Sequence, residues 1–197
     1  MDVVRDIPPG KEAPRIVNVF VEVPEGSRNK YEYDEKLKLI KLDRVLYSPF
    51  HYPGDYGFIP QTWWYDNNPL DVVILTRIPV APGIIVETRP IGAMEMIDNG
   101  EDDIKIIGVP TKDPYYNEIH DIADVAPMMI AEIKHFFEVY KHLQGGVTKI
   151  NHILHKAAAE KIIEQAISNY KEKRKGKKLK LISPEIITKG RIRKIDW

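Results

Sequence analysis

The first 110 residues alternate short apolar runs with clusters of turn residues. Residues 17–23 are rich in β-branched side chains and partly alternate between apolar and polar positions, which is typical of a strand. Residues 31–33 and 37–42 are a second pair of such runs, and the Asp-Glu-Lys stretch between them suits a hairpin connection. Short strands separated by many Pro and Gly residues favour a barrel or a sandwich. Further strands are expected at residues 71–76, 84–88, 91–97 and 104–109.

The last third of the chain changes to a helical period. Asp124 is a candidate N-cap for a first helix, and Gly145-Gly146 is a candidate stop. A second helix is expected from about residue 154 to residue 173. These two long helices should bury one apolar face each. The inward positions are Val125, Met128, Met129, Ile133, Phe136, Phe137 and Tyr140 in the first helix, and Ala158, Ile162, Ile163, Ala166, Ile167 and Tyr170 in the second.

Length and composition indicate one globular domain. The chain has 197 residues, of which 43% are hydrophobic and 29% charged, so a sizeable core is expected and global disorder is not. Residues 1–175 should form the domain, and residues 176–197 a basic C-terminal extension too short and polar to build a core. The N-terminal residues lack the apolar centre of a signal peptide, and no apolar run approaches the roughly 20 residues of a membrane span. A cytoplasmic protein is expected.

Charge and cysteine content restrict the chemistry. The 29 basic and 29 acidic residues cancel, so no global charge points to nucleic acid or to an acidic membrane. The chain has no cysteine, which excludes disulfides, zinc–thiolate sites, iron–sulfur clusters and a cysteine nucleophile. Any metal must therefore be bound by oxygen or imidazole ligands.

Two acidic segments carry the densest chemical signal. Residues 66–71 read Asp-Asn-Asn-Pro-Leu-Asp, and residues 98–103 read Asp-Asn-Gly-Glu-Asp-Asp. Carboxylates are the ligands that a hard cation such as Mg²⁺ prefers. The same residue types form turns, so either segment alone is compatible with a solvated loop. An EF-hand calcium loop starting at Asp66 fits poorly, because Asp71 would replace its turn glycine and Arg77 its bidentate Glu.

A second set of candidates is basic or phenolic. Arg binds phosphate through two parallel hydrogen bonds, Lys supplies a point charge, and Tyr supplies a directed hydroxyl. These residues indicate phosphate binding only if they converge with the acids, and their spacing alone leaves that open. The set comprises Lys30, Arg44, Tyr52, Tyr56, Lys105, Tyr140 and Lys141.

The motif at residues 66–71 resembles the signature of the family I soluble inorganic pyrophosphatases of the prokaryotic type, which usually reads Asp-Gly-Asp-Pro-x-Asp. Similar blocks continue in order from about Pro9 to Gln144, so the resemblance covers most of the chain. The blocks include residues 16–24, 27–32, 42–44, 52–57, 59–63, 89–92, 103–105 and 135–141.

This resemblance implies a fold, a reaction and partners. The family is mainly β with α, a five-stranded closed OB-like barrel with helices packed outside it. Its members split pyrophosphate into two phosphates with Mg²⁺ and metal-activated water, and they need no organic cofactor. The resemblance also implies a homo-oligomer, a hexamer for chains of this kind. Neither a membrane nor a nucleic acid is expected as a partner.

By matching position, the resemblance implies a role for each candidate residue. Asp66, Asp71 and Asp103 correspond to direct metal ligands, Asp98 to a ligand of a further, substrate-linked Mg²⁺, and Glu22 and Glu32 to outer-shell or water-mediated partners. The phosphate-binding positions are Lys30, Arg44, Lys105, Tyr140 and Lys141. Tyr52 and Tyr56 correspond to hydroxyls that order the water and the metals.

Asn68 is the main departure from the family pattern. The family usually has Asp here, the candidate base for the attacking water, and an amide cannot take a proton at neutral pH. A weakened or inactive relative is therefore one alternative. An OB-like module that binds nucleic acid is another, since such barrels commonly bind single strands. The clustered carboxylates argue against it, because they would repel a phosphate backbone.

Overall fold

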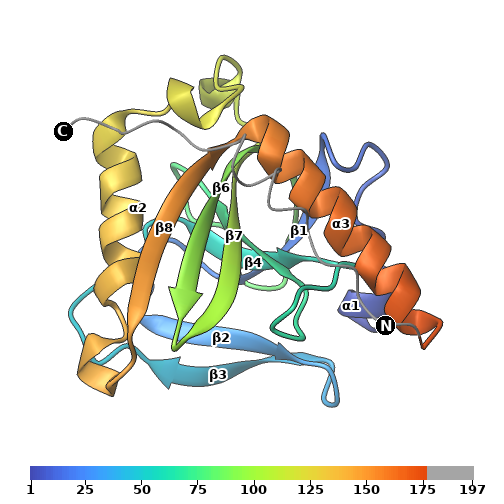
Figure 1. Ribbon diagram of the computed structural model, residues 1–197, viewed down its shortest axis with the longest axis horizontal. Helices are drawn as coiled ribbons and strands as arrows, with labels where there is room; N and C mark the ends of the chain where they lie inside the picture. The colour runs from blue at the N-terminus through green and yellow to red at the C-terminus, as the bar shows by residue number, and fades with distance from the viewer. Residues whose placement is uncertain (177–197) are drawn as a thin grey trace.

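Five strands of this computed structural model, which describes residues 1–176, close into a ring in the order β1-β4-β5-β7-β6, and β6 pairs back to β1. An eighth strand, β8, extends the sheet from β6, and β2 and β3 form a separate hairpin (Figure 1). The predicted fold, mainly β with a closed five-stranded ring and outer helices, is confirmed. The strands are β1 (Val17–Val23), β2 (Asn29–Asp34), β3 (Leu39–Val45), β4 (Asp55–Ile59), β5 (Leu70–Ile74), β6 (Ile85–Asp98), β7 (Glu101–Pro110) and β8 (Thr148–His155).

The ring closes tightly where β1 crosses β4. Val21 of β1 lies opposite Gly57 of β4. A Cβ atom added to Gly57 would lie 1.9 Å from the Phe20 carbonyl oxygen, so only glycine allows this approach. The neighbouring residue Tyr56 thereby reaches a fixed place beside the candidate site.

Two long helices cover opposite sides of β6, β7 and β8 (Figure 1). They are α2 (Pro127–Val139) and α3 (Lys156–Arg174), and a short helix, α1 (Val3–Asp6), lies near the N-terminus. Ala93 and Met94 of β6 point to opposite faces of the sheet, as successive residues of a strand do. Met94 belongs to the apolar cluster that contains the buried residues of α2, and Ala93 to the cluster that contains those of α3.

Most predicted elements are present, but their ends differ. The β2–β3 turn is where it was expected, with Asp34 Oδ1 accepting the N–H groups of Lys36 (2.9 Å) and Leu37 (3.0 Å). The two strands expected at residues 84–88 and 91–97 are one strand, β6, because a shift of register between Pro90 and Gly92 accommodates the missing proline N–H. Strands β4 and β8 were not predicted.

Asp124 is not the N-cap of α2. Helix α2 begins with Pro127, whose missing N–H needs no acceptor, and its N-cap residue Ala126 has no side-chain bond. Asp124 instead ends a short 3₁₀ helix, Ile122–Asp124, and accepts the N–H groups of His120 (2.9 Å) and Asp121 (2.8 Å).

Gly145 ends a further 3₁₀ helix, His142–Gln144, in a left-handed conformation with φ of 75°. Within residues 1–176, no helix is both long enough and apolar enough to cross a membrane. Apart from Gly176, the predicted basic extension at 176–197 lies outside the described residues.

Candidate active site

The loop between β4 and β5 places Asp66 and Asn68. Thr62 is fully buried, and its hydroxyl donates to the Ile59 carbonyl oxygen (2.6 Å) and accepts the Leu70 N–H (2.8 Å). These two bonds join the start of the loop to its end. Asn67 takes a left-handed conformation with φ of 66°, which Asn tolerates better than most residues. The following residue, Asn68, therefore turns back toward the strands.

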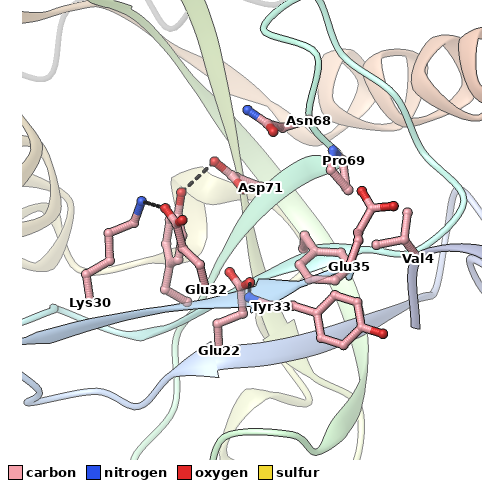
Figure 2. Close-up of a pocket in the computed structure, with 11 residues that line it drawn as sticks. Val4, Glu22, Lys30, Glu32, Tyr33, Glu35, Asn68, Pro69 and Asp71 are labelled. Carbon is pink, nitrogen blue, oxygen red and sulfur yellow. Dashed lines mark hydrogen bonds and ion pairs between the residues drawn. The ribbon is translucent and has the colours of Figure 1, made fainter. Parts of the chain in front are cut away.

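Asn68 lies where two pockets adjoin. Figure 2 shows the first pocket, which Asn68 and Asp71 line together with Glu22, Lys30 and Glu32. The second pocket is formed by Asn68 together with the acidic β6–β7 turn. Its acidic lining residues are Asp66, Asp98, Glu101, Asp102 and Asp103.

Parallel pairing of β5 with β7 sets Asp71 directly beside Lys105. The Lys105 ammonium group is buried and bonds Asp71, and its Nζ lies 2.8 Å from Asp103 Oδ2. The Tyr56 hydroxyl donates to the same Asp71 Oδ2 at 2.5 Å. Burial alone would lower the pKa of Lys105, but the negative charges of Asp71 and Asp103 outweigh it and raise that pKa well above its ordinary value. Lys105 is therefore a permanent buried cation at the centre of the acids.

Glu22 and Asp66 are carboxylates in environments that favour the neutral form. Burial raises the pKa of Glu22 to about 8, although the Tyr33 N–H that donates to it (2.6 Å) partly offsets this effect. Burial and then the charge of Asp71 raise the pKa of Asp66. A bound divalent cation would remove both the mutual repulsion and the cost of burying charge. The residues thus fit a hard cation with oxygen ligands.

Among the described residues, no three acidic or histidine side chains form a group that encloses a metal ion by themselves. The basic side chains explain this arrangement, because they bond the carboxylates directly. Lys105 pairs with Asp71 and Asp103, and Lys141 pairs with Asp98. Acids and bases therefore converge, which their spacing in the sequence had left open.

The β2–β3 hairpin supplies the second cationic side of the site. Lys30 of β2 lies opposite Arg44 of β3. Asp43 pairs with the Arg44 guanidinium, and its Oδ2 lies 3.9 Å from Lys30 Nζ. Arg44 Nε is buried without a partner in residues 1–176, so the guanidinium keeps a donor for an anion. Lys30 also pairs with Glu32, which is half exposed.

Three tyrosines line the side of the site that faces α2. The ring centroids of Tyr52 and Tyr56 are 5.6 Å apart, and those of Phe136 and Tyr140 are 5.0 Å apart. Burial raises the pKa of Tyr52, Tyr56 and Tyr140 above the ordinary phenol value. Their hydroxyls therefore stay protonated at neutral pH and can donate hydrogen bonds to phosphate or water.

Most of the predicted residues fall into bonded groups: Tyr56, Asp71, Lys105 and Asp103; Asp66 and Asn68; Lys30, Glu32 and Arg44; and Asp98 with Lys141. Two residues that were not predicted, Asp43 and Asn99, belong to these groups. Asp43 holds Lys30 and Arg44, and its position inside the matching Leu42-Asp43-Arg44 block was a signal that could have identified it. Asn99 contacts Asp98, which no local pattern indicated. Together, carboxylates that fit divalent cations, a buried Lys and protonated phenols define a class, hydrolases that bind small, strongly anionic phosphate compounds through metal ions.

Comparison with known proteins narrows this class to one family. The sequence model described as inorganic pyrophosphatase matches residues 19–171. The inorganic pyrophosphatase of Geobacillus stearothermophilus is 46% identical over 160 residues, which are 81% of this chain and 97% of that protein. The crystal structure of inorganic pyrophosphatase from Thermus thermophilus has a TM-score of 0.85 at 43% identity and covers 87% of this chain and 99% of that chain. The chain belongs to the inorganic pyrophosphatase family.

A more distant relative carries a ligand. The N-terminally truncated vacuolar soluble pyrophosphatase of Trypanosoma cruzi, solved in complex with PPi, has a TM-score of 0.75 at 28% identity and covers 87% of this chain and 78% of that chain. The predicted family, enzyme class and reaction are confirmed by the family match and by the close relatives. The family match and these relatives do not favour an inactive relative or a nucleic-acid-binding module.

Proposed function

We propose that this chain hydrolyses inorganic pyrophosphate to two phosphates with Mg²⁺ as its metal, at the site centred on Asp71 and Lys105. The observation that carries the proposal is the cross-strand pair itself, in which a buried ammonium group lies between two carboxylates. A site that must bind both divalent cations and a polyphosphate anion needs both signs of charge within one network.

The proposed roles follow the sequence match and are supported by proximity. The carboxylates of Asp66, Asp71 and Asp103 would coordinate metal directly, Asp98 would coordinate a further Mg²⁺ that arrives with substrate, and Glu22 and Glu32 would hold metal-bound water from outside. Lys30, Arg44, Lys105, Tyr140 and Lys141 would bind the phosphoryl oxygens. Tyr52 and Tyr56 would orient the attacking water and the carboxylate of Asp71.

Bound divalent cations would lower the pKa of a water molecule and screen the charge of pyrophosphate. The protein's own cationic side chains would supply the remaining positive charge around pyrophosphate. Arg44, with an unpartnered buried Nε, presents its planar donors to a phosphoryl group, and Lys105 adds a fixed positive charge that cannot leave by deprotonation at neutral pH. Both groups stabilise the negative charge that shifts to the leaving phosphate.

Asn68 stands at the sequence position where the family usually has the candidate base, but its amide cannot act as one. Its side-chain nitrogen lies 3.3 Å from Asp66 Oδ2, and its backbone N–H donates to Asp66 Oδ1 at 3.1 Å. The amide can therefore orient Asp66 or a water molecule but cannot accept a proton. We propose that this chain loses the water proton without a side-chain base at position 68.

Phosphate release from pyrophosphate tests the proposal. Hydrolysis should require Mg²⁺, and Ca²⁺ should substitute poorly because its longer, looser shell misplaces the nucleophile. Lys105→Gln should lower kcat by at least about 100-fold, the order expected for a fixed donor to developing charge. Glu118→Gln, a change at an exposed acid away from the site, should leave the rate unchanged. Undiminished hydrolysis in excess chelator would overturn the metal requirement.

We also propose that the protein is cytoplasmic, that residues 1–175 fold as one domain and that the chain assembles into a homohexamer. Exposed apolar side chains such as Met128, Leu143 and Val147 supply surface that a second copy can bury. Multi-angle light scattering at micromolar concentration should give six times the mass of one chain, 22.7 kDa. A monomer under those conditions would contradict the assembly.

A further inference from the structure

The turn between β6 and β7 has a side chain that does more than form the turn. Asn99 and Gly100 have φ values of 51° and 90°, as an Asn-Gly type I′ turn requires. A turn former needs no partners beyond its own hairpin. Asn99, however, bonds a segment that follows it by almost fifty residues.

Asn99 and Val147 exchange two hydrogen bonds. The Asn99 N–H donates to the Val147 carbonyl oxygen (2.8 Å), and Asn99 Oδ1 accepts the Val147 N–H (3.0 Å). The remaining polar atom of the side chain, Nδ2, donates to Asp98 Oδ1 at 3.0 Å. One amide thus bonds the acidic turn and the segment leading into β8 at the same time.

Residues 141–147 form a short segment that is held together by hydrogen bonds within its own backbone. The Lys141 carbonyl oxygen accepts the N–H groups of Gln144 (2.9 Å) and Gly146 (3.1 Å). A Cβ atom at Gly146 would lie 2.8 Å from the Lys141 Cβ, so the two residues are in close contact. Fixing Val147 therefore fixes Lys141, whose ammonium group pairs with Asp98 Oδ2.

We propose that Asn99 is a positioning residue that holds Asp98 and Lys141 in register with each other. The Asp98 carboxylate is held at Oδ1 by Asn99 Nδ2 and at Oδ2 by Lys141. Asn99 itself acts only through these two groups. The inference rests on the proposed roles of Asp98 in metal binding and of Lys141 in phosphate binding. It adds the residue that holds these two side chains in place relative to each other.

Asn99→Gly removes the side chain and keeps a residue that accepts the left-handed backbone. The Michaelis constant for pyrophosphate and the Mg²⁺ concentration for half-maximal rate should both rise about 3- to 10-fold, a loss of one or two hydrogen bonds to charged or loop groups. The kcat value should change less than about twofold, because the groups remain and binding of the ground state and of the transition state should weaken about equally. Lys38→Gly, at another exposed left-handed turn position with φ of 58°, is the matched control and should alter none of these constants.

A double-mutant cycle separates positioning from a general effect on folding. In a Lys141→Gln background, Asn99→Gly should raise the Michaelis constant by a smaller factor than in the unmodified protein, since one of its two targets, Lys141, has been removed and only Asp98 remains. Equal effects in the two backgrounds would overturn the inference, and so would an unchanged Michaelis constant and Mg²⁺ dependence in the single variant. Thermal unfolding in chelator checks that the variants are folded.

Calorimetry without turnover keeps this test independent of the reaction. Binding of inorganic phosphate in the presence of Mg²⁺ should weaken about 3- to 10-fold in Asn99→Gly and remain unchanged in Lys38→Gly. If the unmodified protein released no phosphate from pyrophosphate, the proposed function would fail, and the phosphate affinities would still decide the role of Asn99. Equal phosphate affinity in the unmodified protein and Asn99→Gly would overturn the inference alone.

Discussion

Two groups of acidic residues in this protein have opposite electrostatic environments. Glu22 and Asp66, in the candidate site, have raised pKa values because burial and neighbouring carboxylates disfavour their charge. Asp121 and Asp124, between β7 and α2, have lowered pKa values. Burial alone would raise the pKa of Asp121, but hydrogen bonds from the Ala123 N–H, His155 and the Lys156 N–H outweigh it.

The two groups of acids differ in how many hydrogen-bond donors their carboxylates accept. Asp121 Oδ1 accepts the Ala123 N–H (3.0 Å) and lies 2.7 Å from His155 Nδ1, while Oδ2 accepts the Lys156 N–H (3.1 Å) at the start of α3. Such a carboxylate is satisfied by the protein itself and stabilises the fold. Glu22 and Asp66 have fewer donors than their charge requires, which is the condition under which a bound cation adds most. In these two pairs, the direction of the pKa shift thus follows whether the donors that each carboxylate accepts outweigh its burial.

The largest expected effect is at Asp71. Asp71→Asn removes a negative charge from the centre of the site, and kcat/KM should fall at least about 1000-fold, or ~4 kcal/mol of barrier. Steady-state phosphate release at saturating Mg²⁺ measures it, and circular dichroism checks the fold. A loss below about tenfold would show that Asp71, whose charge raises the pKa values of Glu22 and Asp66, does not carry the chemistry.

Asn68→Asp should raise turnover, whereas Asp71→Asn should lower it. A carboxylate at this position can take the water proton, and turnover at neutral pH should rise about 10- to 100-fold, within or just below the range expected for a positioned base. The optimum of the unmodified protein should lie at higher pH than that of the variant, because its water must ionise without a side-chain base. The added negative charge beside Asp66 and Asp71 should also tighten Mg²⁺ binding.

Asn67→Asp is the matched control, since it adds the same charge one residue away and should change the rate less than about threefold. An unchanged or lower rate for Asn68→Asp at saturating Mg²⁺ would contradict the base interpretation. A pH profile that does not move would do the same, and would show that water is activated elsewhere in the site.

Asp121 should affect stability and not catalysis. Asp121→Ala should lower the free energy of unfolding by about 2 kcal/mol at neutral pH, the upper value for a lost cap, while Asp121→Asn keeps an acceptor and should lose about half as much. Both variants should keep kcat within about twofold. Urea unfolding and phosphate release measure the two quantities, and a large loss of kcat in fully folded Asp121→Asn would erase the distinction between the two groups.

The stability difference between the unmodified protein and Asp121→Ala should depend on pH. The folded pKa of Asp121 is lower than the unfolded value, so its charge stabilises the fold above the unfolded pKa of about 3.9. That contribution is lost as the pH falls through the lower, folded pKa. The stability gap between the unmodified protein and Asp121→Ala should therefore be full at neutral pH and shrink below about pH 4.

The smallest effect is expected from shortening the chain. Ending it at Lys175 removes the predicted basic extension and leaves both groups of acids intact. Turnover should stay within about threefold, which is ~0.65 kcal/mol of barrier. A much larger loss would show that the extension contributes to the site.

The amino-acid sequence by itself determined the family and most of the local elements of this protein. The blocks around residues 66–71 and 103–105 predicted the acids and Lys105. The helical period predicted the buried faces of α2 and α3, except that Met128 and Met129, expected inside, are exposed. These features depend on residue type and on spacing within one element, and a linear pattern carries both.

Only the tertiary structure decided which of these groups meet. Asp71 and Lys105 are neighbours because β5 and β7 pair in parallel, and β8 exists as a strand because β6 offers it an edge. The raised pKa of Glu22 and the Asn99–Val147 contact likewise depend on segments far apart in the chain. Strand pairing and burial are relations between distant segments, so no local period encodes them, and with them come the charges each acid faces.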